Sequence, residues 1–169
     1  MTEACQIRPA RQQDTGLLLS MILELAEYER AADRVLGTEE LLAAALFDPP
    51  PAAEAVIAAI EGEPVGFALF HGTFSTWLCQ SGIWLEDLYV RPEHRGSGVG
   101  RALITHVARL GVQRGCGRVE LSALDWNTPA LQFYDRLGAT RLDDWKGFRF
   151  EGDSLHRLAD DARGEPAGS

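Results

Sequence analysis

The 169-residue chain is long enough for one domain with a sizeable core, and 46% hydrophobic and 24% charged residues are ordinary for a globular protein. Its net charge of −9 argues against nucleic acid as a partner. No apolar run has the length of a membrane span, and Met1 to Cys5 lack signal-peptide character, so no membrane partner is expected. Three widely spaced cysteines favour reduced thiols and a cytoplasmic location, and no Cys/His spacing predicts a metal site.

The N-terminal part predicts one short strand followed by two helices. Gln6–Pro9 is expected to form an edge strand that ends at its proline. Asp14 and Thr38 each precede an apolar stretch with helical periodicity, so each is predicted to cap a helix with its side chain.

A β-hairpin and a long strand are predicted next. Residues 55–60 and 65–70 are strand-like, and the Glu-Gly-Glu-Pro stretch 61–64 joins them as a turn. A polar loop over 71–82 is expected to lead into a strand at 83–90.

A basic, glycine-rich loop follows this strand, with the sequence Arg95-Gly96-Ser97-Gly98-Val99-Gly100. Glycines let the backbone approach an anion closely, and the first N–H groups of a helix have no partner within the helix. The loop therefore predicts a phosphate site. The helix after it has a clear apolar face, formed by Val99, Leu103, Val107 and Leu110.

Several interpretations of this loop compete. A P-loop requires a lysine after the glycines, and none is present. A dinucleotide-binding fingerprint requires a third glycine where Arg101 stands, although Glu120 lies where that motif has an acid. A plain turn would not require three glycines within five residues. The pattern Arg-x-x-Gly-x-Gly after a strand fits this loop better than a P-loop, a dinucleotide-binding fingerprint or a plain turn.

The C-terminal part predicts a strand at 119–123 and a helix capped by Asn127 or Thr128, and a last strand at Trp145–Glu151. A single helical turn at 154–158 precedes the polar stretch 160–169, which is expected to be disordered.

The loop and the order of elements resemble the GNAT acetyltransferases, and among them the diamine (spermidine/spermine) acetyltransferases. The matching stretches are Ile7-Arg8-Pro9-Ala10, Glu24-Leu25-Ala26-Glu27-Tyr28-Glu29, Leu85-Glu86-Asp87, the glycine loop, Trp126-Asn127-Thr128-Pro129 and Phe133-Tyr134-Asp135-Arg136-Leu137-Gly138-Ala139. The resemblance implies an α/β single-domain GNAT fold over residues 1–159, with a mixed central sheet of about six to seven strands flanked by about four helices.

The resemblance also implies acetyl-CoA as co-substrate, with no metal. Backbone groups of the residues after Leu85-Glu86-Asp87 would contact the pantetheine arm. The glycine loop would hold the pyrophosphate, and Asn127 would contact the far side of the pantetheine arm. The residues implied to bind acetyl-CoA are Leu88, Tyr89, Val90, Arg95, Gly96, Ser97, Gly98, Val99, Gly100, Arg101, Asn127 and Ala130.

The implied reaction is transfer of the acetyl group to a primary amine of a small polyamine or amino-acid-like substrate, by direct attack in a ternary complex. Tyr134 matches the tyrosine that protonates the departing thiolate, and Glu86 is a candidate base. Adjacent Asp87 is expected on the opposite face of the sheet unless a bulge intervenes. The residues implied to line the acceptor site are Tyr28, Glu29, Glu86, Glu120, Leu121, Ser122 and Lys146.

One departure from the family pattern concerns the acceptor. Lys146 stands where the polyamine enzymes carry an acid, so thialysine, another amino-acid-like amine or a protein amine is an alternative to a polyamine. A GNAT-fold acyl-CoA sensor without turnover is the alternative from another functional class. The resemblance further implies a homodimer.

Overall fold

The computed structural model describes residues 5–161, which contain a five-stranded sheet and five α-helices. In chain order the elements are β1 (Gln6–Pro9), α1 (Thr15–Tyr28), α2 (Glu39–Phe47), β2 (Glu54–Ile60), β3 (Glu63–Ser75), β4 (Gln80–Val90), α3 (Val99–Gln113), β5 (Val119–Leu121), α4 (Thr128–Arg136) and α5 (Asp153–Asp161). The chain divides into two compact units, Met1–Ser122 and Ala123–Ser169.

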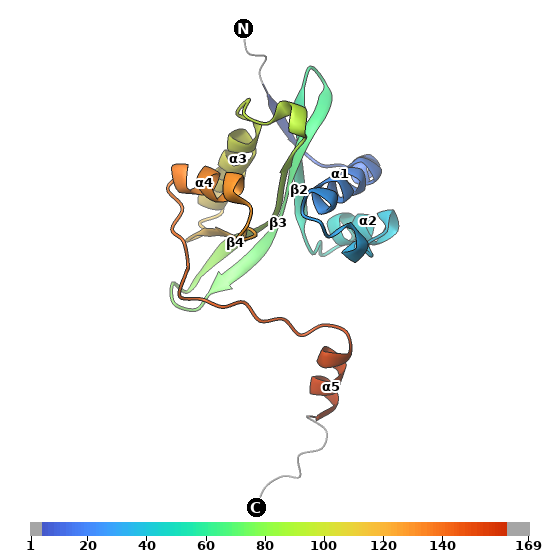
Figure 1. Ribbon diagram of the computed structural model, residues 1–169, viewed down its shortest axis with the longest axis vertical. Coiled ribbons are helices and arrows are strands. Elements are labelled where there is room, and N and C mark those ends of the chain that lie inside the picture. Colours follow the sequence, from blue (N-terminus) through green and yellow to red (C-terminus); the bar gives the residue numbers. More distant parts are fainter. Residues whose placement is uncertain (1–4, 162–169) are drawn as a thin grey trace, which may run out of the picture. The chain divides into compact units, whose positions relative to one another are not determined.

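The sheet of the N-terminal unit has the order β1-β2-β3-β4-β5. Its first four strands are antiparallel, whereas β5 pairs parallel to β4 with Ile83 opposite Val119. Parallel pairing needs a crossover connection, and α3 provides it. Figure 1 shows α1 and α2 on one side of the sheet and α3 on the other.

Each face of the sheet buries its own hydrophobic core. On the α3 side, Phe70 and Leu85 pack with Leu103; on the other side, Phe67 packs with Leu18 and Met21 of α1. Burial on both faces explains why β2 and β3 carry near-continuous apolar runs rather than an alternating pattern.

Several local predictions are confirmed. The Thr38 hydroxyl accepts a hydrogen bond from the Leu41 N–H at 3.3 Å and caps α2. The predicted hairpin joins β2 to β3, and its turn is only Glu61 and Gly62, which both have positive φ as two-residue hairpin turns require; Glu63 and Pro64 already belong to β3. The predicted apolar face of α3 packs into the core.

The predicted side-chain cap at Asp14 is wrong. Asp14 precedes α1, but its carboxylate accepts hydrogen bonds from the Arg8 guanidinium at 2.6 and 2.8 Å and from the Arg11 N–H at 2.7 Å. The Arg8 contact, offset in part by burial, lowers the pKa of Asp14. The Asp14 carboxylate therefore links Arg8 of β1 to the turn before α1.

Three further expectations about secondary structure are wrong. Residues 71–82 extend the β3–β4 hairpin and leave only a short turn, instead of forming a long loop. Trp145–Glu151 form no strand, because no strand of the described chain pairs with them, so the sheet has five strands rather than six or seven. The turn predicted at 154–158 is the helix α5, which also includes two residues of the expected tail, Asp160 and Asp161; residues 162–169 lie outside the described chain.

Among residues 5–161, none of the helices has the combined length and apolar character that crossing a membrane requires.

Candidate functional site

A β-bulge at Glu86 determines which side chains of β4 share a face. Leu85 pairs with Phe70 of β3, but the next pair joins Asp87 to Leu69, so Glu86 is the extra residue. In a regular strand alternate residues share a face, and Asp87 would join Leu85 in the core under α3. The extra residue places Asp87 on the opposite face.

The core contacts agree with this shift. Ile83 and Leu85 pack against α3 before the bulge, and Leu88 and Val90 do so after it, whereas Tyr89 packs in the core beside α1. The sequence predicted that Asp87 would lie on the opposite face from Glu86 unless a bulge intervened, and the bulge is present. Glu86 and Asp87 can therefore lie in the same region although they are adjacent in sequence.

Three carboxyl groups interact around this bulge. Burial, followed by the charges of Glu86 and Glu29, raises the pKa of Asp87 from 3.8 to about 6. Glu29 directly follows α1 as its C-cap, and burial also raises the pKa of Glu29. The structure thus brings together two predicted acceptor-site residues, Glu29 and Glu86, with a third carboxyl that titrates close to neutral pH. Such a group suits proton transfer.

Glu86 itself is exposed and held by its neighbours. The Trp84 indole N–H donates to Glu86 Oε2 at 2.7 Å, and His71 Nε2 lies 3.9 Å from the same oxygen. These contacts orient the Glu86 carboxylate without removing it from water.

Asp87 is the carboxyl of this cluster that the sequence did not place among the acceptor-site residues. Its signal is visible in the pattern of apolar residues on β4: Ile83 and Leu85 occupy odd positions, whereas Leu88 and Val90 occupy even ones. A change of parity inside a strand indicates one extra residue, and hence a bulge.

The glycine loop has the open backbone that an anion requires. Gly96 and Gly98 have φ values of 79° and 93°, which favour glycine, and Gly98 is the N-cap of α3. A Cβ atom at either position would meet nothing within 4 Å, so the space beside the loop is open. The first N–H groups of α3 lack helical partners and face this end of the helix. A pyrophosphate fits these features.

Arg95 connects this loop to the end of α1. Its Nε donates to the Val90 carbonyl at 2.9 Å. Its guanidinium carbon lies 4.5 Å from the centre of the Tyr28 ring and 5.8 Å from that of Tyr89, within the range of cation–π attraction. A residue predicted for the acyl donor and one predicted for the acceptor, Arg95 and Tyr28, therefore lie in contact.

The hydroxyl end of the Tyr89 side chain is held by Glu24. Its hydroxyl donates to Glu24 Oε2 at 3.0 Å, and Arg91 donates to both oxygens of Glu24 at 3.3 and 3.1 Å. Burial and the Glu24 contact raise the pKa of Tyr89 to about 12. The side chain of Tyr89 thus stabilises the end of β4, while its backbone remains in the strand before the loop.

The predicted residues of β5 divide between the two faces. Glu120 pairs opposite Trp84, on the face that carries Asp87, and its carboxylate accepts the Arg118 Nε contact at 2.7 Å. Leu121 pairs opposite Leu85 and packs into the core on the α3 side. Ser122 follows the strand.

The remaining predicted residues belong to the C-terminal unit. Asn127, one of the two caps that the sequence allows, caps α4 by accepting the Ala130 N–H at 3.3 Å. Tyr134 lies on α4 with its ring 5.2 Å from that of Phe133 in an edge-on arrangement, and burial raises the pKa of Tyr134 to about 12. Lys146 is exposed in the segment between α4 and α5.

Comparison with known proteins identifies the fold and the family. Residues 19–139 match the Acetyltransferase (GNAT) family. The chain belongs to this family. The expected GNAT fold and acyltransferase class are thereby confirmed, and enzymes of the family use acetyl-CoA.

Two curated relatives and one solved structure refine the comparison. The thialysine N-epsilon-acetyltransferase of Sus scrofa is 42% identical over 90% of this chain and 96% of its own length. The human spermidine/spermine N(1)-acetyltransferase-like protein 1 is 29% identical over 91% of this chain and 24% of its own length. An integron cassette protein from the mobile metagenome of V. cholerae has a TM-score of 0.77 at 26% identity, covering 94% of this chain and 98% of its own. The similarity to the thialysine N-epsilon-acetyltransferase supports the prediction that this chain is an N-acetyltransferase that acts on a small amine.

The conformation of Gly98 makes a paired substitution informative. Gly98→Ala is expected to lower the free energy of unfolding by about 1 kcal/mol, because alanine is strained at a φ of 93°. Gly100→Ala, within α3, should instead raise it by about 0.5–1 kcal/mol, since alanine is the better helix former. Urea denaturation of both variants tests this; effects of the same sign would contradict the assigned loop conformation.

Proposed function

We propose that this GNAT acetyltransferase moves the acetyl group of acetyl-CoA to the side-chain amine of a thialysine-like amino acid. The observation that carries the proposal is the carboxyl cluster of Glu29, Glu86 and Asp87 beside the Arg95–Tyr28 contact. The 42% identity to a thialysine N-epsilon-acetyltransferase supports this class of acceptor.

The proposed roles follow from charge and proton affinity. The attacking amine must be neutral, and deprotonating an alkylammonium of pKa about 10.4 at pH 7 costs roughly 4–5 kcal/mol. Positioning of the reactants can offset about 7–11 kcal/mol, so a base of moderate strength suffices. Asp87, with a pKa of about 6, accepts the amine proton, while Glu29 and Glu86 attract the cationic substrate.

The acyl donor is bound by the strand end and the glycine loop. Backbone groups of Leu88, Tyr89 and Val90 contact the pantetheine arm, and the N–H groups of residues 96–101 hold the pyrophosphate. Acetyl-CoA supplies the reactive thioester. Tyr134 donates a hydrogen bond to the departing sulfur, and Asn127 and Ala130 contact the arm. The open space beside Gly96 and Gly98 supports this assignment.

A panel of amines tests the proposal. Thiol release from acetyl-CoA should be fastest with thialysine, with kcat/KM at least about tenfold above that for spermidine, since the protein's own Lys146 would repel a polycation. Lys146→Glu should raise kcat/KM for spermidine and leave that for thialysine little changed. Faster turnover of spermidine by wild type would refute the acceptor class. Binding of acetyl-CoA with no turnover of any amine would instead favour the sensor alternative.

We also propose that the protein is a cytoplasmic homodimer. All three cysteines, Cys5, Cys79 and Cys116, are free thiols, which supports a reducing compartment. Several large apolar side chains of the segment between α4 and α5 are exposed, and a second copy would cover them: Leu142, Trp145, Phe148 and Phe150. A monomeric mass in light scattering would refute the dimer.

A further inference from the structure

His71 and Glu86 lie side by side on the face of the sheet that carries Asp87. Phe70 of β3 packs in the core on the α3 side, so the next residue, His71, lies on the other face. His71 pairs with Trp84 of β4, and its Nε2 lies 3.9 Å from Glu86 Oε2. The two side chains are 38% and 56% exposed, so a ligand can reach both.

Each of these two groups is oriented by a different neighbour. His71 Nδ1 lies 3.1 Å from the Gly72 carbonyl, and because a carbonyl can only accept, Nδ1 carries a hydrogen. The Trp84 indole N–H donates to Glu86 Oε2 at 2.7 Å. At 3.9 Å, His71 Nε2 and Glu86 Oε2 are too far apart to form a hydrogen bond with each other. Protonation of Nε2 adds a second donor beside the carboxylate, so the pair presents a donor for an anion and an acceptor for a cation.

The distance from this pair to Asp87 matches the length of the proposed acceptor. Asp87 pairs with Leu69 of β3, and His71 lies two residues further along that strand. Two residues of a β-strand span about 7 Å. In extended thialysine, five bonds of about 1.5 Å separate the reacting nitrogen from the α-carbon, which amounts to roughly 6 Å. An acceptor with its side-chain amine at Asp87 would therefore bring its α-carbon close to His71 and Glu86.

We propose that His71 and Glu86 bind the amino-acid head group of the acceptor, His71 through the α-carboxylate and Glu86 through the α-ammonium. The inference rests on the proposed function, because it takes the acceptor to be a thialysine-like amino acid. A diamine carries no carboxylate and would use only Glu86. His71 is thus a specificity-determining residue that favours α-amino acids over diamines of the same length.

Steady-state kinetics with two acceptors that differ by one carboxylate test the proposal. The acceptors are thialysine and its decarboxylated analogue, bis(2-aminoethyl) sulfide, at about pH 6.5, within the range in which imidazoles gain a proton. Wild type should show a kcat/KM for thialysine about tenfold above that for the analogue, as a charge-assisted bond to the carboxylate would provide. His71→Gln should raise KM for thialysine about tenfold and leave kcat, and both constants for the analogue, within about twofold. His71→Lys, which keeps a cation at this position, should retain most of the preference.

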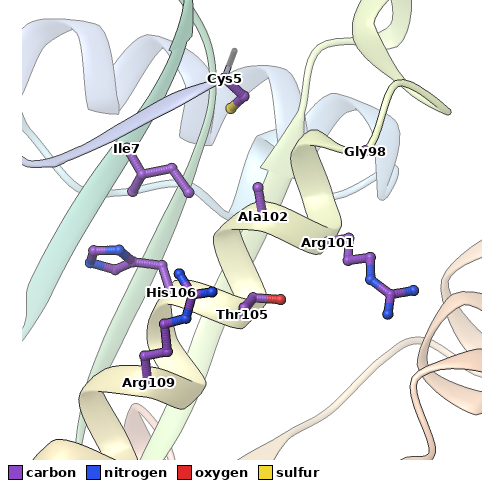
Figure 2. Close-up of a pocket in the computed structure, with 8 residues that line it drawn as sticks. All are labelled: Cys5, Ile7, Gly98, Arg101, Ala102, Thr105, His106 and Arg109. Carbon is purple, nitrogen blue, oxygen red and sulfur yellow. The ribbon is translucent and has the colours of Figure 1, made fainter. Parts of the chain in front are cut away.

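Two further variants separate the head-group contacts from general effects. Glu86→Gln should raise KM for both acceptors, because both carry a second ammonium group. His106→Gln is the matched control, since His106 lies on α3, on the other side of the sheet, where it lines a groove with Arg101 and Arg109 (Figure 2). His106→Gln should leave the ratio of the two kcat/KM values at the wild-type level.

The outcomes keep this inference distinct from the proposed function. Equal kcat/KM of wild type for both acceptors, or a preference for thialysine that His71→Gln retains, would overturn the head-group site and leave acetyl transfer to a small amine intact. A loss in His71→Gln that is equal for both acceptors would also overturn it, because a general change of structure gives that pattern. An equal loss of preference in His71→Lys and His71→Gln would overturn the contact between charges. Absence of turnover with either acceptor would overturn the proposed function itself.

Discussion

Asp87→Asn is expected to lower kcat/KM by about 100-fold, because it removes the proposed proton acceptor while keeping the size of the side chain. In wild type, kcat/KM should fall as pH drops through about 6, where Asp87 becomes protonated, and this acid limb should disappear in the variant. Steady-state rates between pH 5 and pH 8 measure both effects.

The same substitution is expected to stabilise the fold at neutral pH. The unfolded carboxyl ionises near pH 4, whereas the folded one keeps its proton to about pH 6, so wild type loses stability across that interval and does not regain it above. The difference between the two pKa values corresponds to about 3 kcal/mol, which solvent screening of a partly exposed group reduces to about 1–2 kcal/mol. Urea denaturation at pH 4 and pH 7.5 should show the gain only at the higher pH.

Glu86→Gln is the matched control for Asp87→Asn. It removes one carboxylate from the same cluster, but Glu86 is exposed and oriented by Trp84. We expect a weaker effect, mainly on KM for the amine, together with a lower pKa for Asp87, since one repelling charge is gone. A larger loss of kcat in Glu86→Gln than in Asp87→Asn would assign the base to Glu86.

Tyr134→Phe is expected to reduce kcat by about 100-fold with little change in KM for either substrate. Burial raises the pKa of Tyr134 to about 12, so the phenol keeps its proton throughout the assay range. Its acidity is far below that of a thiol, with a pKa near 8.5, so Tyr134 stabilises the departing sulfur as a hydrogen-bond donor. The rate should therefore show no alkaline limb from this group below about pH 10.

A neighbouring ring provides the control for Tyr134. Phe133 packs edge-on against Tyr134, and Phe133→Leu disturbs that packing without removing the hydroxyl. For Phe133→Leu we expect a kcat within about threefold of wild type, because this substitution changes only the packing and keeps the Tyr134 hydroxyl. Similar losses of kcat in both variants would show that Tyr134 acts through packing of α4 instead.

Features that depend on neighbours in the chain were predictable from sequence. The Thr38 and Asn127 caps, the hairpin turn after β2 and the apolar face of α3 each follow from a few adjacent residues, and all are observed, although the turn is only the two residues Glu61 and Gly62. The glycine loop belongs to this class, since positive φ at Gly96 and Gly98 is a local property. These features, with the family resemblance, were enough to identify the fold and the class of reaction.

Tertiary structure decided what depends on pairing between distant segments. Whether Trp145–Glu151 form a strand depends on a partner, and the described chain provides none. The position of Asp87 depends on how β4 aligns with β3, where one extra residue moves the carboxyl from the core beneath α3 to the face that carries Glu29. The contact of Arg95 with Tyr28 likewise joins two elements far apart in sequence. Sequence by itself thus determined the elements and the family, because their causes are local. Strand register, which is a long-range property, decided which carboxyl groups lie close together.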